Sequence, residues 1–314
     1  MNISSRLAPV SRRSFLAGAA GLAASAALPR GLFAAEAPHR FMHGDFEVIV
    51  ISDGYLTLPV NLHAFDTPEE EKKAVLEAAG LTGETTNPAV NLTLLRKGDE
   101  LILFDVGTGP NMAPTGGKSD EALRAVGIAP ESVTKVVFSH GHPDHIWGTL
   151  SNEGKLRFPN AAYYSAGEEW DFWMAPDILT KLPEQMHQMA TETQRHYTAV
   201  KEVVTMVKPG EEIVTGVGII DTRGHTPGHV SFEVAGGDGL IIVADAIPHP
   251  GVYFPHPEWK FMYDATHEQA IASRRSLLDR AATDKALMLG YHWTYPGLGY
   301  AERKGQAYVY VPQS

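Results

Sequence analysis

Four side chains that can bind metal ions lie within six residues, in the run His140-Gly141-His142-Pro143-Asp144-His145. His140 and His142 alternate, so they can project together from an extended or tightly turned segment. Asp144 and His145 lie on the next turn and can face a second point nearby. With further ligands from distant parts of the chain, such a loop can hold two ions a few ångströms apart. The run therefore predicts a fold that gathers several loops around it.

Three later sites offer those further ligands. His225 lies in the run Gly224-His225-Thr226-Pro227-Gly228-His229, Asp245 follows an apolar segment, and His292 follows another. Each follows a segment expected to be a strand, where loops face solvent. The sequence contains no cysteine, so any metal must bind to His, Asp or Glu.

Strands and helices are mixed along the chain, without a repeat or a linker, which predicts the α/β class. The expected strands are 46–52, 91–96, 101–104, 134–138, 161–165, 218–221, 230–234, 240–243, 286–289 and 307–311. The expected helices are 119–126, 168–174 and 267–281, and residues 176–207 are expected to be mostly helical, with breaks near Pro176 and Pro183. Asp53-Gly54 is read as a turn that ends the first strand.

The N-terminus has the pattern of a targeting signal. Arg12 and Arg13 precede an apolar, alanine-rich stretch over 16–28, and Ala35-Glu36-Ala37 offers a cleavage site. These features predict a twin-arginine signal peptide over 1–37 and export to the periplasm or beyond by the Tat pathway. Residues 38–314 are then expected to form a single catalytic domain without stable membrane insertion. An uncleaved N-terminal anchor is the alternative.

The charge of the chain bears on its partners. The formal net charge is −11, and such a surface repels polyanions. We therefore expect a small-molecule substrate rather than nucleic acid, and a homodimer is a further expectation.

Taken in order, these motifs resemble those of the metallo-β-lactamase-fold hydrolases. The run 140–145, the later Gly-His-Thr-Pro-Gly-His run, the isolated Asp245 and the C-terminal His292 occur in the order of that family. The resemblance covers nearly everything from about residue 46 onward. It implies an αβ/βα sandwich in which two mixed β-sheets are flanked by helices and the metals lie at one edge.

The resemblance also implies a role for each ligand. It implies that the first metal binds His140, His142 and His225, that the second binds Asp144, His145 and His292, and that Asp245 bridges both. The two divalent ions are expected to be zinc, with Mn, Fe or Co as alternatives, because His and Asp ligands accept all of these.

Three nearby residues have supporting or open roles. Asp105 resembles an acidic residue of the family that hydrogen-bonds a ligand imidazole, although it can also cap the Gly-rich turn at 107–110. His229 is expected in the second shell or in a structural role, since the first histidine of its motif is the ligand. Asp53 can likewise hydrogen-bond a residue of the site or stabilise a turn, and the turn is the preferred interpretation.

A hydroxide that bridges two metals is expected to attack an ester-type centre, while Asp144 or Asp245 moves the proton. Within the family, the chain looks most like methyl parathion hydrolase and the quorum-quenching lactonases. This resemblance rests on residues 53–59, 169–173 and 292–299.

An aromatic pocket of Trp147, Trp173 and Trp293 would suit a neutral lactone such as an acyl-homoserine lactone. Trp147 departs from the family, which commonly has a small residue there. The alternatives are an organophosphate triester hydrolase, then a β-lactamase, and, as a different class, a redox or metal-binding protein of the same fold.

Overall fold

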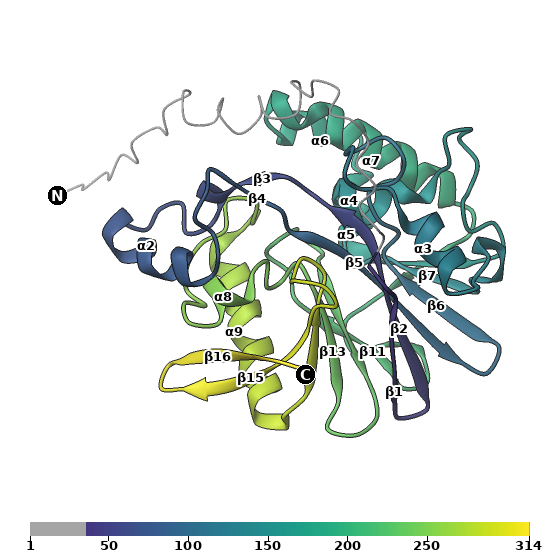
Figure 1. Ribbon diagram of the computed structural model, residues 1–314. Helices are drawn as coiled ribbons and strands as arrows, with labels where there is room; N and C mark the ends of the chain where they lie inside the picture. The colour runs from purple at the N-terminus through teal and green to yellow at the C-terminus, as the bar shows by residue number, and fades with distance from the viewer. Residues whose placement is uncertain (1–35, 314) are drawn as a thin grey trace. The chain divides into compact units, whose positions relative to one another are not determined.

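Two mixed β-sheets of seven strands each dominate the computed structural model, which describes residues 36–313 (Figure 1). The first sheet comprises β1 (His39–His43), β2 (Phe46–Tyr55), β5 (Ala89–Lys97), β6 (Glu100–Phe104), β7 (Lys135–Val137), β8 (Ala162–Ala166) and β9 (Val204–Val207). The second comprises β10 (Glu212–Val214), β11 (Val217–Asp221), β12 (Val230–Val234), β13 (Leu240–Ala244), β14 (Leu287–Gly290), β15 (Leu298–Lys304) and β16 (Ala307–Pro312). A small sheet pairs β3 (Leu58–Pro59) with β4 (Thr85–Thr86).

The two large sheets pack face to face through a shared hydrophobic core. Val50 and Phe104 from the first sheet lie in one buried cluster with Phe232 and Ile242 from the second. The rings of Phe104 and Phe232 are 4.8 Å apart between centroids. Strands β6 and β13 are buried on both faces, which explains why their sequences are continuously apolar rather than alternating.

Helices cover the outer face of each sheet, as Figure 1 shows. The helices near the first sheet are α3 (Ser119–Ala125), α4 (Pro143–Ile146), α5 (Gly167–Trp173), α6 (Ile178–Lys181) and α7 (His187–Val200). Those near the second are α8 (Pro250–Tyr253) and α9 (His267–Asp284), while α2 (Glu69–Ala78) contacts α8. Short 3₁₀ turns are η2 (Val60–Leu62), η3 (Pro130–Ser132), η4 (Trp147–Thr149) and η5 (Glu184–Met186). Leu277, Leu278 and Ala281 of α9 are buried in the outer core of the second sheet. The predicted αβ/βα sandwich is confirmed.

Two local predictions are wrong. Residues 176–207 are mostly helical, as predicted, but the prediction is wrong at their end: α7 ends at Val200, and residues 204–207 form β9, which pairs in parallel with β8. Asp53-Gly54 does not end β2, which continues to Tyr55 through a shift in register. Gly54 has a φ of +109°, and a Cβ there would lie 2.0 Å from the carbonyl oxygen of Thr115. The glycine is needed for close approach inside a strand rather than for a turn.

Five strands end beside one another and place the functional side chains. Asp105 follows β6, the run 140–145 follows β7, and His225, Asp245 and His292 follow β11, β13 and β14. Contacts group the described residues 36–313 into one compact unit. None of the helices in residues 36–313 is both long and apolar enough to span a membrane. The predicted signal peptide, apart from its last two residues, lies outside the described residues.

Candidate metal centre

Three histidine nitrogens converge on one point beside Asp245. We call these four residues, His140, His142, His225 and Asp245, the first group. The Nε2 of His140 and the Nε2 of His225 lie 3.0 Å and 2.9 Å from the Nδ1 of His142. Oδ2 of Asp245 lies 3.3 Å from the Nε2 of His225 and 3.9 Å from that of His140. The four ligand atoms all lie within 4.8 Å of one another. Such a set can hold one metal ion.

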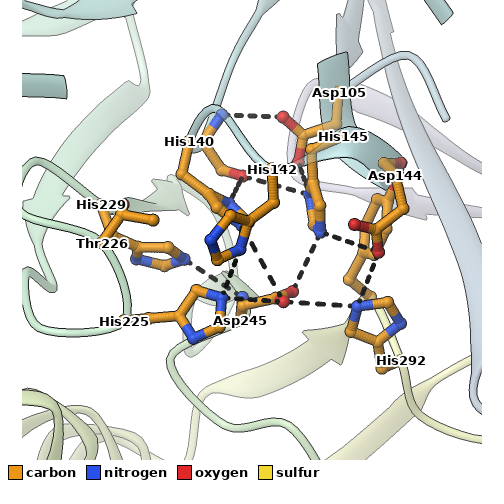
Figure 2. Close-up of polar contacts among 12 residues, drawn as sticks. Asp105, His140, His142, Asp144, His145, His225, Thr226, His229, Asp245 and His292 are labelled. Carbon is orange, nitrogen blue, oxygen red and sulfur yellow. Dashed lines mark hydrogen bonds and ion pairs between the residues drawn. The ribbon is translucent and has the colours of Figure 1, made fainter. Parts of the chain in front are cut away.

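Asp144, His145 and His292 form a second group beside the first. Oδ2 of Asp144 lies 3.5 Å from the Nε2 of His145 and 3.2 Å from the Nε2 of His292. Asp245 also faces this group, because its Oδ1 and Oδ2 lie 3.2 Å and 3.3 Å from the same two nitrogens. Figure 2 shows Asp245 between the two sets of rings. The structure thus brings together all seven residues that were predicted to bind metal.

The run 140–145 is held in place by a one-turn helix. His142 is extended, with φ −72° and ψ 155°, and Pro143 begins α4 at the first helical position, where its missing N–H costs nothing. The turn directs Asp144 and His145 to the second group. A Cβ on Gly141 would lie 2.5 Å from the Nε1 of Trp173, so only glycine fits between His140 and His142.

The outward nitrogen of four ligand rings has a fixed partner, which points the other nitrogen into the centre. These partners are Ser139 Oγ for His140 (3.0 Å), Asp105 Oδ2 for His145 (2.8 Å), Asp264 Oδ1 for His225 (3.0 Å) and the Ala89 carbonyl for His292 (2.8 Å). Each of these acceptors takes the Nδ1–H, so the Nε2 of each ring carries the lone pair that a metal requires.

Asp105 orients His145, which agrees with the expectation that it hydrogen-bonds a ligand imidazole. Besides the imidazole, it accepts the backbone N–H and the hydroxyl of Ser139 at 2.8 Å and 2.7 Å. Its φ of +56° is uncommon for a residue other than glycine. The Gly-rich loop is held instead by Asp53, which accepts bonds from Thr108, Gly117 and Ser119. Asp53 therefore supports a loop and does not enter the centre.

His229 lies behind the ligands. Its Nδ1 is 2.8 Å from the Oγ1 of Thr222, and its Nε2 accepts the backbone N–H of Asp245 at 3.2 Å. The ring thus holds the backbone of Asp245 and leaves no nitrogen for a metal. This position agrees with the supporting role expected for His229.

The buried polar atoms fit metal ions. Within residues 36–313, the Nε2 of His145 and the Oδ1 of Asp245 are buried and accept or donate no hydrogen bond, although such atoms are nearly always paired. Imidazole nitrogens and carboxylate oxygens are the donors that zinc prefers in the absence of cysteine, and Mn, Fe and Co accept them too.

The pKa values show that the centre favours positive charge. Burial and the neighbouring His225 lower the pKa of His142 to about 3, which keeps its ring neutral. Burial opposes a proton on His292, yet the charge of Asp245 and the bond to Asp144 raise its pKa to about 10. His225 is raised to a pKa of about 9 by Asp245 and Asp264 against the effect of burial. The carboxylates thus favour cations here, a role that divalent ions can fill.

The three tryptophans predicted to line a substrate pocket do not form one. Trp173 and Trp293 are each 1 % exposed, and their indole N–H groups donate to Glu169 and to the Ile247 carbonyl. They therefore lie behind the ligands, where a substrate cannot touch them. Trp147 is half-buried, stacks on His196 and lines a separate surface depression to which none of the seven ligands contributes.

Aromatic residues that the sequence reading passed over lie closer to the ligands. Tyr291 stacks on His145, with ring centroids 3.9 Å apart, and its hydroxyl donates to the Asp144 carbonyl. Tyr263 is 45 % exposed, and burial together with the charge of Asp144 raises its pKa. Because Tyr291 directly precedes His292 in the sequence, its position near the ligands could have been predicted. No motif in the sequence points to Tyr263.

Two buried charged residues were also missed. Glu169 accepts four hydrogen bonds, from Gly141, Trp173, Thr226 and Gly228, and so joins the two histidine-rich loops. Asp264 holds His225. Neither residue belongs to a recognisable metal motif, because Glu169 holds the loops that carry the ligands and Asp264 holds a ligand from a distant part of the chain.

Solved structures of similar proteins share this fold. AidC, described as a dizinc quorum-quenching lactonase in complex with a product, is 28% identical, with a TM-score of 0.82 over 88% of this chain and 97% of its own. AbOPH, described as a hydrolase in the beta lactamase superfamily, is 26% identical, with a TM-score of 0.82 over 88% and 98%. A probable metal-dependent hydrolase from Staphylococcus aureus, at 16% identity and a TM-score of 0.72 over 87% and 99%, supports the fold alone.

Among curated proteins, no sequence matches the chain. Residues 85–292, which include all seven predicted ligands, match the family model of the metallo-beta-lactamase superfamily. Because this match spans more than half of the chain and the fold agrees with it, the chain belongs to the metallo-beta-lactamase superfamily.

Proposed function

We propose that this hydrolase uses two metal ions, one in each group, to open a neutral lactone of the acyl-homoserine lactone type. The observation that carries the proposal is the position of Asp245, whose two oxygens face both groups at 3.2–3.3 Å. The likeness to AidC, a lactonase described as dizinc, supports the substrate class.

Two divalent ions, when bound, would activate water near neutral pH and polarise the substrate carbonyl. The side chains then have separate tasks. Asp144 and Asp245 have lowered pKa values, because the attraction of nearby histidines outweighs burial, so both are carboxylates at neutral pH. Oδ2 of Asp144 can accept the proton of the attacking water and return it to the leaving alkoxide. His229 holds Asp245 in position throughout.

A neutral substrate with an apolar arm agrees with the surroundings of the centre. The net charge of −11 disfavours anionic substrates. His142 and His292 are partly exposed, so the centre opens to solvent on their side. Tyr263 offers an exposed aromatic ring there, and buried Phe261 stacks on His225 with centroids 6.2 Å apart. The exposed ring of Tyr263 can contact the acyl arm while the lactone carbonyl faces the ligands.

A substrate panel on metal-replete protein tests the proposal. We expect turnover of N-hexanoyl-homoserine lactone, slower turnover of the phosphotriester paraoxon, and none of the β-lactam nitrocefin. Protein stripped with a chelator should lose the activity and regain it with zinc. Failure to open the lactone at a content of two metals per chain would refute the substrate class, and faster turnover of paraoxon would favour the triester hydrolase. A colourless zinc protein would exclude the redox alternative.

We also propose that residues 1–37 are a twin-arginine signal and that the mature protein works outside the cytoplasm. The paired Arg12 and Arg13 before an apolar stretch support this. Fractionation of expressing cells, with N-terminal sequencing of the exported protein, tests it. Changing both arginines to lysine should retain the full-length protein in the cytoplasm.

A further inference from the structure

Arg274 of α9 is completely buried, with an exposure of 0%. Its guanidinium donates through Nε to the Ala246 carbonyl at 3.1 Å. Its Nη1 donates to the carbonyls of Pro257 and Trp259 at 3.1 Å and 2.8 Å, and its Nη2 donates to Oδ2 of Asp264 at 3.1 Å. A buried charge is costly unless it is paired and hydrogen-bonded, so this set of acceptors restricts the guanidinium to one position.

Two of these contacts lead directly to ligands of the first group. Asp264, which pairs with Arg274 through one oxygen, accepts the Nδ1–H of His225 with the other at 3.0 Å. Ala246, whose carbonyl binds the guanidinium, is the neighbour of Asp245. A single side chain thus holds the orientation of His225 and the backbone beside Asp245, two ligands that lie twenty residues apart.

We propose that Arg274 is a positioning residue for the first group and that it sets the affinity of that group for metal more strongly than the affinity of the second, because only the first group receives both contacts. The proposal rests on the proposed two-metal function. The planar fork of arginine can serve several fixed acceptors at once, whereas the ammonium of lysine is a single point charge. Partners of metal ligands commonly change metal affinity by about 10- to 100-fold when removed.

Arg157 supplies a matched control. Its side chain is 7% exposed, and it donates to the carbonyls of Val106 and Gly148 at 3.2 Å and 2.8 Å, and to Asp120. It is therefore another nearly buried arginine that binds loops around the centre. Within residues 36–313, its hydrogen bonds go to Val106, Gly148, Ser119 and Asp120, and to neither Asp264 nor Asp105, the carboxylates that hold His225 and His145.

The test measures metal binding in proteins that keep one group each. In a His145→Ala background, which retains the first group, Arg274→Met should weaken zinc binding about 10- to 100-fold in chelator competition. Arg157→Met should change it less than about twofold. In a His225→Ala background, which retains the second group, Arg274→Met should weaken zinc binding by a clearly smaller factor, because Arg274 reaches that group only through the backbone beside Asp245. Arg274→Lys, which keeps the pairing with Asp264, should recover part of the loss.

Equal losses in both backgrounds, or wild-type affinity in Arg274→Met with the first group alone, would overturn the proposal. Should Arg274→Met fail to fold by circular dichroism, Asp264→Asn breaks the same connection while the three carbonyl contacts remain, and it should weaken only the first group. Wild-type affinity in a folded Asp264→Asn would equally overturn the proposal. If the wild-type protein itself bound fewer than two zinc ions, the two-metal function would fail instead.

Discussion

The two halves of the molecule contribute to the centre in different ways. The half built on the first sheet supplies four candidate ligands from the single run after β7, whereas the half built on the second supplies His225, Asp245 and His292 from three separate strand ends. The carboxylates that hold the rings come from similar sequence distances in both halves: Asp105 lies 40 residues from His145, and Asp264 lies 39 residues from His225 and pairs with the buried Arg274. Local spacing therefore places the candidate ligands of the first half, whereas tertiary packing brings together those of the second.

The largest effect is expected where the two halves meet, at Asp245. Asp245→Asn removes the charge that faces both groups, so the metal content should fall at both. The rate of hydrolysis should fall about 10³-fold, because the activation barrier rises by several kcal/mol. Metal analysis and the lactone assay measure this. Full activity with two metals bound would contradict the site assignment.

Replacing one ligand from each half should separate the groups. His225→Ala removes a ligand of the first group only, and His145→Ala removes one of the second only, so each protein should bind one zinc ion instead of two. Titration with zinc, followed by mass spectrometry of the native protein, counts the ions. Loss of both ions from either variant would show that the groups are not independent.

Glu169 tests how firmly the halves are joined. Its carboxylate accepts bonds from Gly141 in the first half and from Thr226 and Gly228 in the second. Glu169→Gln replaces one acceptor oxygen by an NH₂ group, which then faces other donors and has no acceptor. The change should reduce the free energy of unfolding by about 2–3 kcal/mol. Urea denaturation of the metal-free protein measures this.

The neighbouring Glu168→Gln is the control for that change, because Glu168 is exposed and pairs with Arg223 at the surface. Its loss should cost less than about 1 kcal/mol. Equal effects of the two changes would mean that Glu169 does not connect the halves.

The smallest effect concerns His196, a buried residue of the first half that lies outside the ligand set. Burial, and then Arg195, lower its pKa to about 4, whereas a histidine in the unfolded chain has its ordinary pKa of 6.5. The unfolded state therefore binds more protons between these values, so His196 lowers stability as the pH falls from about 6.5 to about 4. His196→Phe should flatten this part of the profile of unfolding free energy against pH. An unchanged slope would contradict the prediction.

Sequence periodicity and turn chemistry predicted most strands, including the hairpin at 91–104, which the structure places in β5 and β6. They failed at residues 204–207, because an apolar β-branched segment after a helix can continue it or join a sheet, and only the presence of β8 decides. The tryptophans failed for a similar reason. An aromatic residue near a ligand can face the substrate or support the ligand from behind, and burial depends on the whole fold.

The sequence by itself predicted the candidate ligands and their order, because metal chemistry requires particular residue types and His140–His145 are close along the chain. Only the tertiary structure decided how those ligands are held. Asp264 and Arg274 have no motif, since their role arises when α9 packs against the second sheet and carries a guanidinium to within hydrogen-bonding distance of a carboxylate. Contacts between residues far apart in sequence leave no local pattern, and the support of His225 consists of such contacts.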